Sequence, residues 1–103
     1  MVKEILEMAG IKHRETRFIQ PPEETYAVFH DSYINRGADQ KNLICEHDYT
    51  IELYSYNPDP QIESRIEDLL NERSIEFNKQ ERYWIESEQL YQVVYEFSAI
   101  MKI

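Results

Sequence analysis

The sequence is poor in glycine, proline and cysteine. Its 103 residues include 2 glycines, 4 prolines and a single cysteine, Cys45. So few glycines and prolines argue against a low-complexity chain. One cysteine excludes an internal disulfide and a cysteine-rich zinc site, and it fits a protein made in a reducing cytosol. No apolar run approaches the ~18 residues of a membrane span, and the first residues do not open a signal peptide, so we expect a soluble protein without membrane contact.

Basic residues are also scarce. There are 11 Lys and Arg against 20 Asp and Glu, which gives a formal net charge of −9. Nucleic acids and anionic membranes require clustered positive side chains, so we expect no direct sequence-specific binding of nucleic acid. Hydrophobic residues make up 42% of the chain and aromatics 13%, which is enough to build a core. At this length we expect a single α+β domain over residues 1–103.

Two segments have helical periodicity. Apolar residues at positions 2, 5, 6 and 9 predict a short helix that stops at Gly10. Asp59 can cap a second helix that begins at Pro60 and ends near Arg73. We expect its apolar stripe to face a sheet, with charged residues on the opposite side. The stripe is Ile62, Ile66, Leu69 and Leu70, and the charged set is Glu63, Arg65, Glu67, Asp68 and Glu72.

The rest of the chain consists of short runs of alternating apolar and polar residues, separated by turn-forming residues. This pattern predicts strands over residues 13–19, 25–34, 43–56, 82–86 and 90–102, and a short strand that includes Ile75 and Phe77. We expect Pro21-Pro22 to end the first strand, a loop over 35–39, and turns at 79–81 and 87–89. Tyr83 and Ile85 should form a buried pair with Trp84 on the other face. The predicted fold is a two-layer α+β structure, a mostly antiparallel sheet of about five strands with two helices on one face.

Catalytic signatures are weak. Cys45 and His47 share a strand face, but no third catalytic group is implied, and a small buried hydrophobe is the commoner role for a free cysteine. A metal site from Cys45, His47 and Asp48 matches no zinc spacing. The many carboxylates are typical of solvated faces, and no glycine-rich phosphate loop is present. We therefore expect neither an enzyme nor a cofactor, although a hydrolase or metal-dependent enzyme using His47 remains an alternative.

Tyrosine is the informative surplus, with 8 in the chain. Tyr54 and Tyr56 alternate with Ile51 and Leu53 and so occupy the outer strand face. Exposed amphipathic rings are typical of protein contact surfaces, and the alternative is that a loop or the N-terminal segment covers them. We predict an interface from this face and from a projecting polar loop. Its candidates are Thr50, Glu52, Tyr54, Tyr56, Trp84, Arg36, Asp39 and Lys41.

Several segments, taken in order, resemble small neck or tail-completion proteins of long-tailed phages and prophages of Gram-positive bacteria. They are residues 21–28 (PPEETYAV), 49–54 (YTIELY), an acidic helix from Pro60, 83–86 (YWIE) and 91–96 (YQVVYE). The resemblance runs from about residue 5 to 97 and consists of strand and turn patterns. It implies a small α+β fold, a tail-terminator-like or head-closure role, and no catalytic residues.

The same resemblance implies the partners and the location. It implies self-association, often into a hexameric ring, where tail-tube proteins meet the head connector. The protein would then assemble in the bacterial host cytoplasm and end in the virion neck or tail. The rival interpretation is a small acidic binding module of the inhibitor or immunity type, whose acidic face masks a basic partner.

Overall fold

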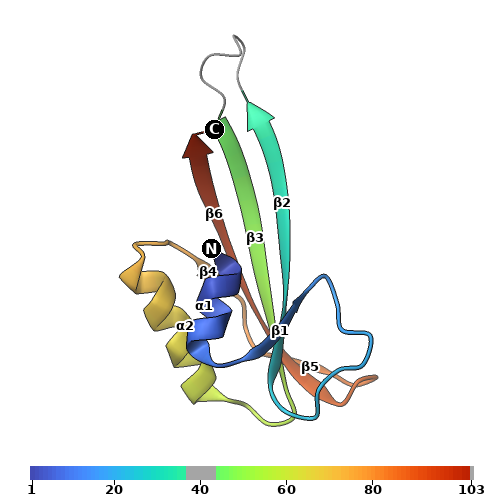
Figure 1. The fold of residues 1–103 in the computed structure, drawn as a ribbon. Coiled ribbons are helices and arrows are strands. Elements are labelled where there is room, and N and C mark those ends of the chain that lie inside the picture. The colour runs from blue at the N-terminus through green and yellow to red at the C-terminus, as the bar shows by residue number, and fades with distance from the viewer. Residues whose placement is uncertain (37–43, 103) are drawn as a thin grey trace.

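The computed structural model describes residues 1–36 and 44–102 and confirms the α+β fold. Six strands form one open, mostly antiparallel sheet in the order β1-β2-β3-β6-β4, with β5 also paired to β6. Only the β1–β2 pair is parallel. Figure 1 shows both helices beside the lower part of the sheet. The elements are α1 (Val2–Ala9), β1 (Lys12–Glu15), β2 (Tyr26–Arg36), β3 (Ile44–Ser55), α2 (Pro60–Glu72), β4 (Asn78–Lys79), β5 (Tyr83–Ile85) and β6 (Leu90–Lys102).

Both helices have the ends that the sequence predicts. Gly10 ends α1 with a left-handed φ of 74°, and its N–H donates to the Glu7 carbonyl. At the start of α2, Asp59 Oδ1 accepts from the Ile62 N–H at 3.3 Å, and Pro60 is the first helical residue. The Thr25 hydroxyl donates to the other Asp59 oxygen at 3.0 Å. The cap therefore also ties α2 to the segment that leads into β2.

The main core lies between the helices and one face of the sheet. α1 contributes its whole apolar stripe, and β3 contributes Tyr49, Ile51 and Leu53, as expected. Ile66 and Leu70 of α2 are fully buried. Ile62 and Leu69 are partly buried and pack against the same core, as expected. The prediction that Glu63 faces solvent is wrong, because this side chain is buried between α2 and the sheet.

A smaller cluster covers the opposite face of the sheet. Tyr26, Val28 and Leu90 are buried there, with Phe18 and Tyr54 packed against them. Phe18 belongs to the connection between β1 and β2, and its ring meets the Tyr26 ring edge-on at 5.3 Å. The sheet is thus covered by helices on one face and by a loop on part of the other.

Several predicted strand limits are wrong. The first strand ends at Glu15, because Thr16 adopts a positive φ of 72° that breaks the extended backbone. Pro21-Pro22 therefore lies in the connection and does not end a strand. Ile75 and Phe77 pack against the core outside any strand, and β4 includes Lys79, which we expected in a turn. Tyr83 is exposed, so it does not form the expected buried pair with Ile85.

The upper ends of three strands project beyond the helices and beyond β1 (Figure 1). Residues 30–36 of β2 pair with residues 44–50 of β3, which pair in turn with residues 96–102 of β6. We call this three-stranded projection the arm. Asn35 and Arg36, which we expected in a loop, belong to β2, and the rest of the predicted loop lies outside the described residues. None of the helices in the described part combines the length and apolar composition that crossing a bilayer requires.

Candidate interaction surface

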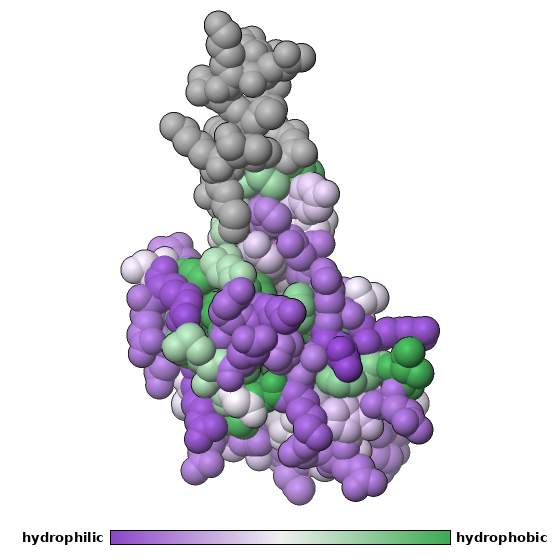
Figure 2. Space-filling view, viewed as in Figure 1, coloured by the Kyte–Doolittle hydropathy of each residue, from purple (hydrophilic) through white to green (hydrophobic). Residues whose placement is uncertain are grey.

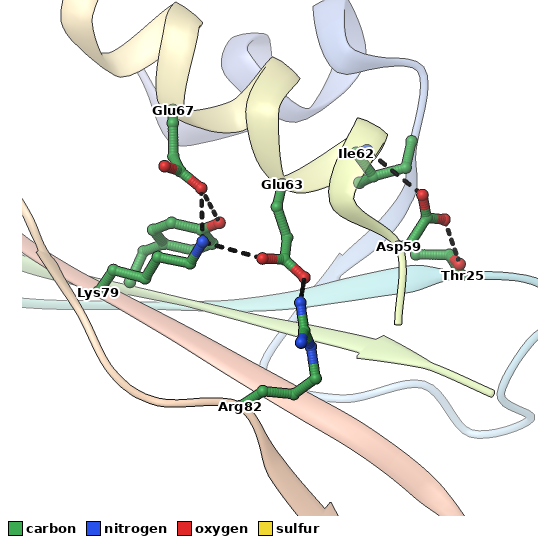
Figure 3. Close-up of polar contacts among 8 residues, drawn as sticks. Thr25, Asp59, Ile62, Glu63, Glu67, Lys79 and Arg82 are labelled. Carbon is green, nitrogen blue, oxygen red and sulfur yellow. Dashed lines mark hydrogen bonds and ion pairs between the residues drawn. The ribbon is translucent and has the colours of Figure 1, made fainter. Parts of the chain in front are cut away.

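A buried ionic cluster anchors α2 to the C-terminal half of the chain (Figure 3). Glu63 lies in the first turn of α2 and is only 4% exposed. One of its carboxylate oxygens pairs with the Lys79 ammonium at 2.9 Å, and the other accepts from the Arg82 guanidinium at 2.7 Å. Lys79 also contacts Glu67 at 2.9 Å, and the Tyr95 hydroxyl donates to that same Glu67 carboxylate.

The electrostatics of this cluster favour the ionised carboxylate. Burial alone would raise the pKa of Glu63, but hydrogen bonds from Arg82 and Lys79 outweigh burial and leave that pKa below its ordinary value. Burial, and then the bond to Glu67, raise the pKa of the Tyr95 phenol. The cluster therefore holds the segment that contains β4 in place beside β6, at the base of the arm.

Sequence spacing could have revealed the burial of Glu63. This residue precedes Ile66 by three positions and Leu70 by seven, so it lies on the same helical face as the two best-buried residues of α2. Its cations could not be found in this way. Lys79 is the last residue of β4 and Arg82 follows it, and the pairing of β4 with β6 brings both near α2.

Tyr54 lies on the sheet face away from the helices and is half-buried. Its ring stacks on the Tyr26 ring with centroids 5.2 Å apart. Its hydroxyl donates to Glu52 Oε1 and accepts from the Gln92 amide, both at 3.0 Å. Burial, with a contribution from the Glu52 charge, raises the pKa of Tyr54 to about 12. Because its hydrogen-bond partners belong to this chain, Tyr54 mainly holds this sheet face in position and offers little free surface to another protein.

An open cleft of about 370 Å³ lies beside this pair of tyrosines. Loop residues from the β1–β2 connection form one wall, and the β5–β6 turn forms another. Its floor is aromatic, and Glu52 and Glu88 add carboxylates while Arg17 adds a cation. The lining includes Phe18, Tyr26, Tyr54, Ile85 and Leu90.

The structure separates the residues that the sequence grouped as an interface. Thr50, Glu52 and Tyr54 share the face away from the helices, and Tyr56, beyond the end of β3, is 48% exposed. Trp84 does not join them. It pairs with Tyr91, their rings are 4.8 Å apart, and Tyr91 alternates with the core residues Val93 and Tyr95 on the helix-bearing face. Arg36 ends β2, whereas Asp39 and Lys41 lie outside the described residues.

The arm has an outer strand edge on each side. The pairing of β1 with β2 ends at Phe29, and the pairing of β4 with β6 extends no further than Glu96. Within the described strands, β2 beyond Phe29 and β6 beyond Glu96 have a neighbour on one side only, and that neighbour is β3. The sequence predicts these strands but does not show which of them lie at the edges of the sheet, because the order of strands in a sheet is a tertiary property.

Cys45 and His47 have a third partner that the sequence did not reveal. The Cys45 sulfur lies 3.1 Å from His47 Nε2, and His47 Nδ1 donates to Asp31 at 2.7 Å. The His47 ring also stacks on Tyr49. This order of groups resembles a nucleophile, a base and an orienting acid, but the thiol is buried, so the chain of contacts mainly joins β3 to β2. Asp48 lies on the other face and accepts from Ser98 at 2.6 Å, so Cys45, His47 and Asp48 do not converge on one metal position.

The surface is predominantly hydrophilic on the side that Figure 2 shows, with apolar residues in small separate patches.

No family model matches the sequence, and no curated protein matches it. Among solved structures, the fold is similar to a chain in a structure described as the virion of a native gene transfer agent particle. The match has a TM-score of 0.64 at 10% sequence identity and covers 96% of this chain and 84% of the other.

Proposed function

We propose that this protein is a virion structural component that acts in tail completion or head–tail joining through protein–protein contact. The observation that carries the proposal is the fold. The fold is similar, over 96% of this chain, to a chain in a structure described as a virion particle. The resemblance of the strand and turn segments to phage neck proteins points the same way.

The proposed partners are further copies of this chain, tail-tube proteins and the head connector. A ring, with six copies as the resemblance implies, would assemble in the host cytoplasm and remain in the neck of the particle. The net charge of −9 suits contact with proteins and disfavours direct binding to packaged DNA. Mass action leaves such a ring dissociated in dilute solution and forms it on its partners.

The proposed contact face is the sheet face away from the helices. Tyr56 is 48% exposed, and Thr50 and Glu52 lie along the face of β3 that points away from the helices. Tyr54 is half-buried in that face, and its hydrogen bonds to Glu52 and Gln92 hold these side chains in position. Amphipathic aromatic residues at the centre of a contact give much of the binding energy, so Tyr56 is the residue to change.

The experiment is complementation of a phage that lacks the gene, with tail joining scored by electron microscopy. Tyr56→Arg should leave heads and tails separate or give tails of irregular length, because it places a bulky charge in the contact. Ser64→Arg is the matched control, since it adds the same charge on the exposed side of α2. Both variants are first checked for cooperative thermal unfolding. Normal joining with a folded Tyr56→Arg protein would overturn the assignment of this face.

A second readout separates the proposed role from its rival. A virion component is recovered in purified particles in a fixed ratio to the tail proteins. An acidic inhibitor or immunity-type module would instead be absent from particles and would copurify with a basic partner. Absence from particles would overturn the proposed function whatever the result for Tyr56.

A further inference from the structure

We propose that, in the assembled protein, the outer edge of β2 in one copy pairs with the outer edge of β6 in the next copy, so that the arms form one continuous sheet. This inference rests on the proposed assembly role and names the surfaces that carry it. The occupant of each edge is thus a second copy of this chain.

The direction of the backbone groups shows which residues are available for pairing. The Phe29 carbonyl accepts from the Thr16 N–H, so Phe29 turns its backbone groups toward the outer side of β2. Backbone groups of alternate residues point to the same side, so Asp31 and Tyr33 present their N–H and C=O outward. On β6, the Val94 carbonyl accepts from the Gln80 N–H, and the same alternation turns the backbone of Ser98 outward.

Between its end residues, neither edge carries proline or lysine, and the one acidic residue there, Asp31, bonds to His47 of β3. Soluble proteins cover or shorten such edges, or place proline or lysine on them. β2 continues from Phe29 to Arg36 and β6 from Glu96 to Lys102. The intervening residues, HDSYIN on β2 and FSAIM on β6, contain no proline and no Lys or Arg. Long unprotected edges of this kind are expected where pairing with another chain is part of function.

The two edges complement each other in direction and length. β2 and β6 are both antiparallel to β3, so they run parallel to each other on opposite sides of the arm. Copies related by rotation about an axis along the arm would place β2 of one copy beside β6 of the next as parallel neighbours. Such a contact is heterologous, and it closes into a ring when the rotation closes. An edge that paired with an unrelated partner would leave the second edge of the same arm uncovered.

A cleft beside β6 can receive side chains of the incoming strand. It has a volume of about 620 Å³, lies next to the point where β4 ends, and includes Ile75, Phe77, Phe97 and Ala99 in its lining. Tyr33 is 61% exposed and pairs in register with His47, on the same sheet face as the helices. An incoming β2 would therefore direct its Tyr33 toward the side of the sheet on which this cleft opens.

The test uses two variants that each block one edge. Tyr33→Pro removes an outward N–H of β2, and Ser98→Pro removes an outward N–H of β6. Proline is tolerated where the lost N–H faces away from the sheet. Tyr33→Ala and Ser98→Ala are the matched controls, because they remove the same side chains and keep the N–H groups. If either proline variant fails to unfold cooperatively, Tyr33→Lys and Ser98→Lys, which place a charge on each edge, replace the pair.

Sedimentation velocity measures association of the purified full chain at up to about 1 mM, a range that detects weak contacts of about 4 kcal/mol. We expect the wild type and Ser98→Ala to associate beyond dimers, and Tyr33→Ala to associate in the same way but more weakly, because it loses the ring that faces the cleft. Each proline variant alone should stay monomeric, and an equimolar mixture should form dimers, because each member keeps the edge that the other lacks. Association should also strengthen with salt, which screens repulsion between acidic copies.

The opposite results are equally clear. A wild type that is monomeric throughout, a proline variant that associates like its alanine control, or a mixture that stays monomeric would each overturn edge pairing. These outcomes would not affect the proposed function if the protein is still recovered in virions. Conversely, edge pairing in a protein absent from virions would overturn the function and leave the interface standing.

Discussion

Leu69 and Leu70 are adjacent leucines in α2 with different surroundings, and they allow a matched test of how this helix packs. Leu70 has no exposed surface and packs with Ile66 and the core of the sheet, whereas Leu69 is only partly buried. Leu70→Ala removes a fully enclosed side chain and leaves a cavity, which costs ~2–5 kcal/mol. Leu69→Ala loses only part of the burial of the same groups, so we expect about 1 kcal/mol.

Both substitutions replace leucine by alanine in the same helix, so they change helix propensity by nearly the same amount. For a chain of this size each kcal/mol lowers the melting temperature by roughly 4–8 °C. A loss of about 3.5 kcal/mol, the middle of that range, for Leu70→Ala would thus lower the melting temperature by roughly 14–28 °C. Urea unfolding followed by far-ultraviolet circular dichroism measures both variants. Equal losses, or a larger loss at Leu69, would show that α2 presents a different face to the sheet.

Three further predictions test the anchor, the outer face and the helix cap. The pKa of Glu63 is lowered in the folded state, so the stability that its ionised carboxylate contributes is present above its unfolded pKa and is lost as pH falls through its folded pKa. Glu63→Gln should therefore weaken the dependence of stability on pH below about 4.3. An unchanged acid-unfolding curve would contradict the ionised pairing. Burial raises the pKa of Tyr54 to about 12, so Tyr54→Phe should remove one late-ionising phenol from the ultraviolet titration of the protein. Loss of an early-ionising phenol instead would contradict the burial of Tyr54. Asp59→Ala should cost ~1 kcal/mol by removing the cap, with Asp59→Asn as the conservative control, and equal stability of all three proteins would show that the cap contributes nothing.

Local patterns in the sequence were enough to predict the fold class and both helices. The i, i+3, i+4 spacing in the N-terminal helix, Gly10 after it, and Asp59-Pro60 before the second helix each act within a few residues, so their physics is readable without tertiary structure. The alternation of β3 also holds, with Ile51 and Leu53 inside and Tyr54 on the other face.

Features that depend on distant partners were not predicted. Glu63 is buried because two cations from the β4 region reach it, and His47 meets Asp31 only through the register of β2 with β3. Trp84 was grouped with Tyr54, yet the pairing of β5 with β6 places it on the other face. The free edges of the arm likewise follow from strand order, which composition and periodicity do not specify.

The most direct test of the central claim is electron microscopy of particles produced after deletion of this gene from a phage or prophage that carries it. The virion-joining role predicts filled heads and tails that remain separate, or tails of irregular length, and recovery of normal particles when the wild-type chain is supplied in trans. Normal tailed and infectious particles without the gene would contradict it.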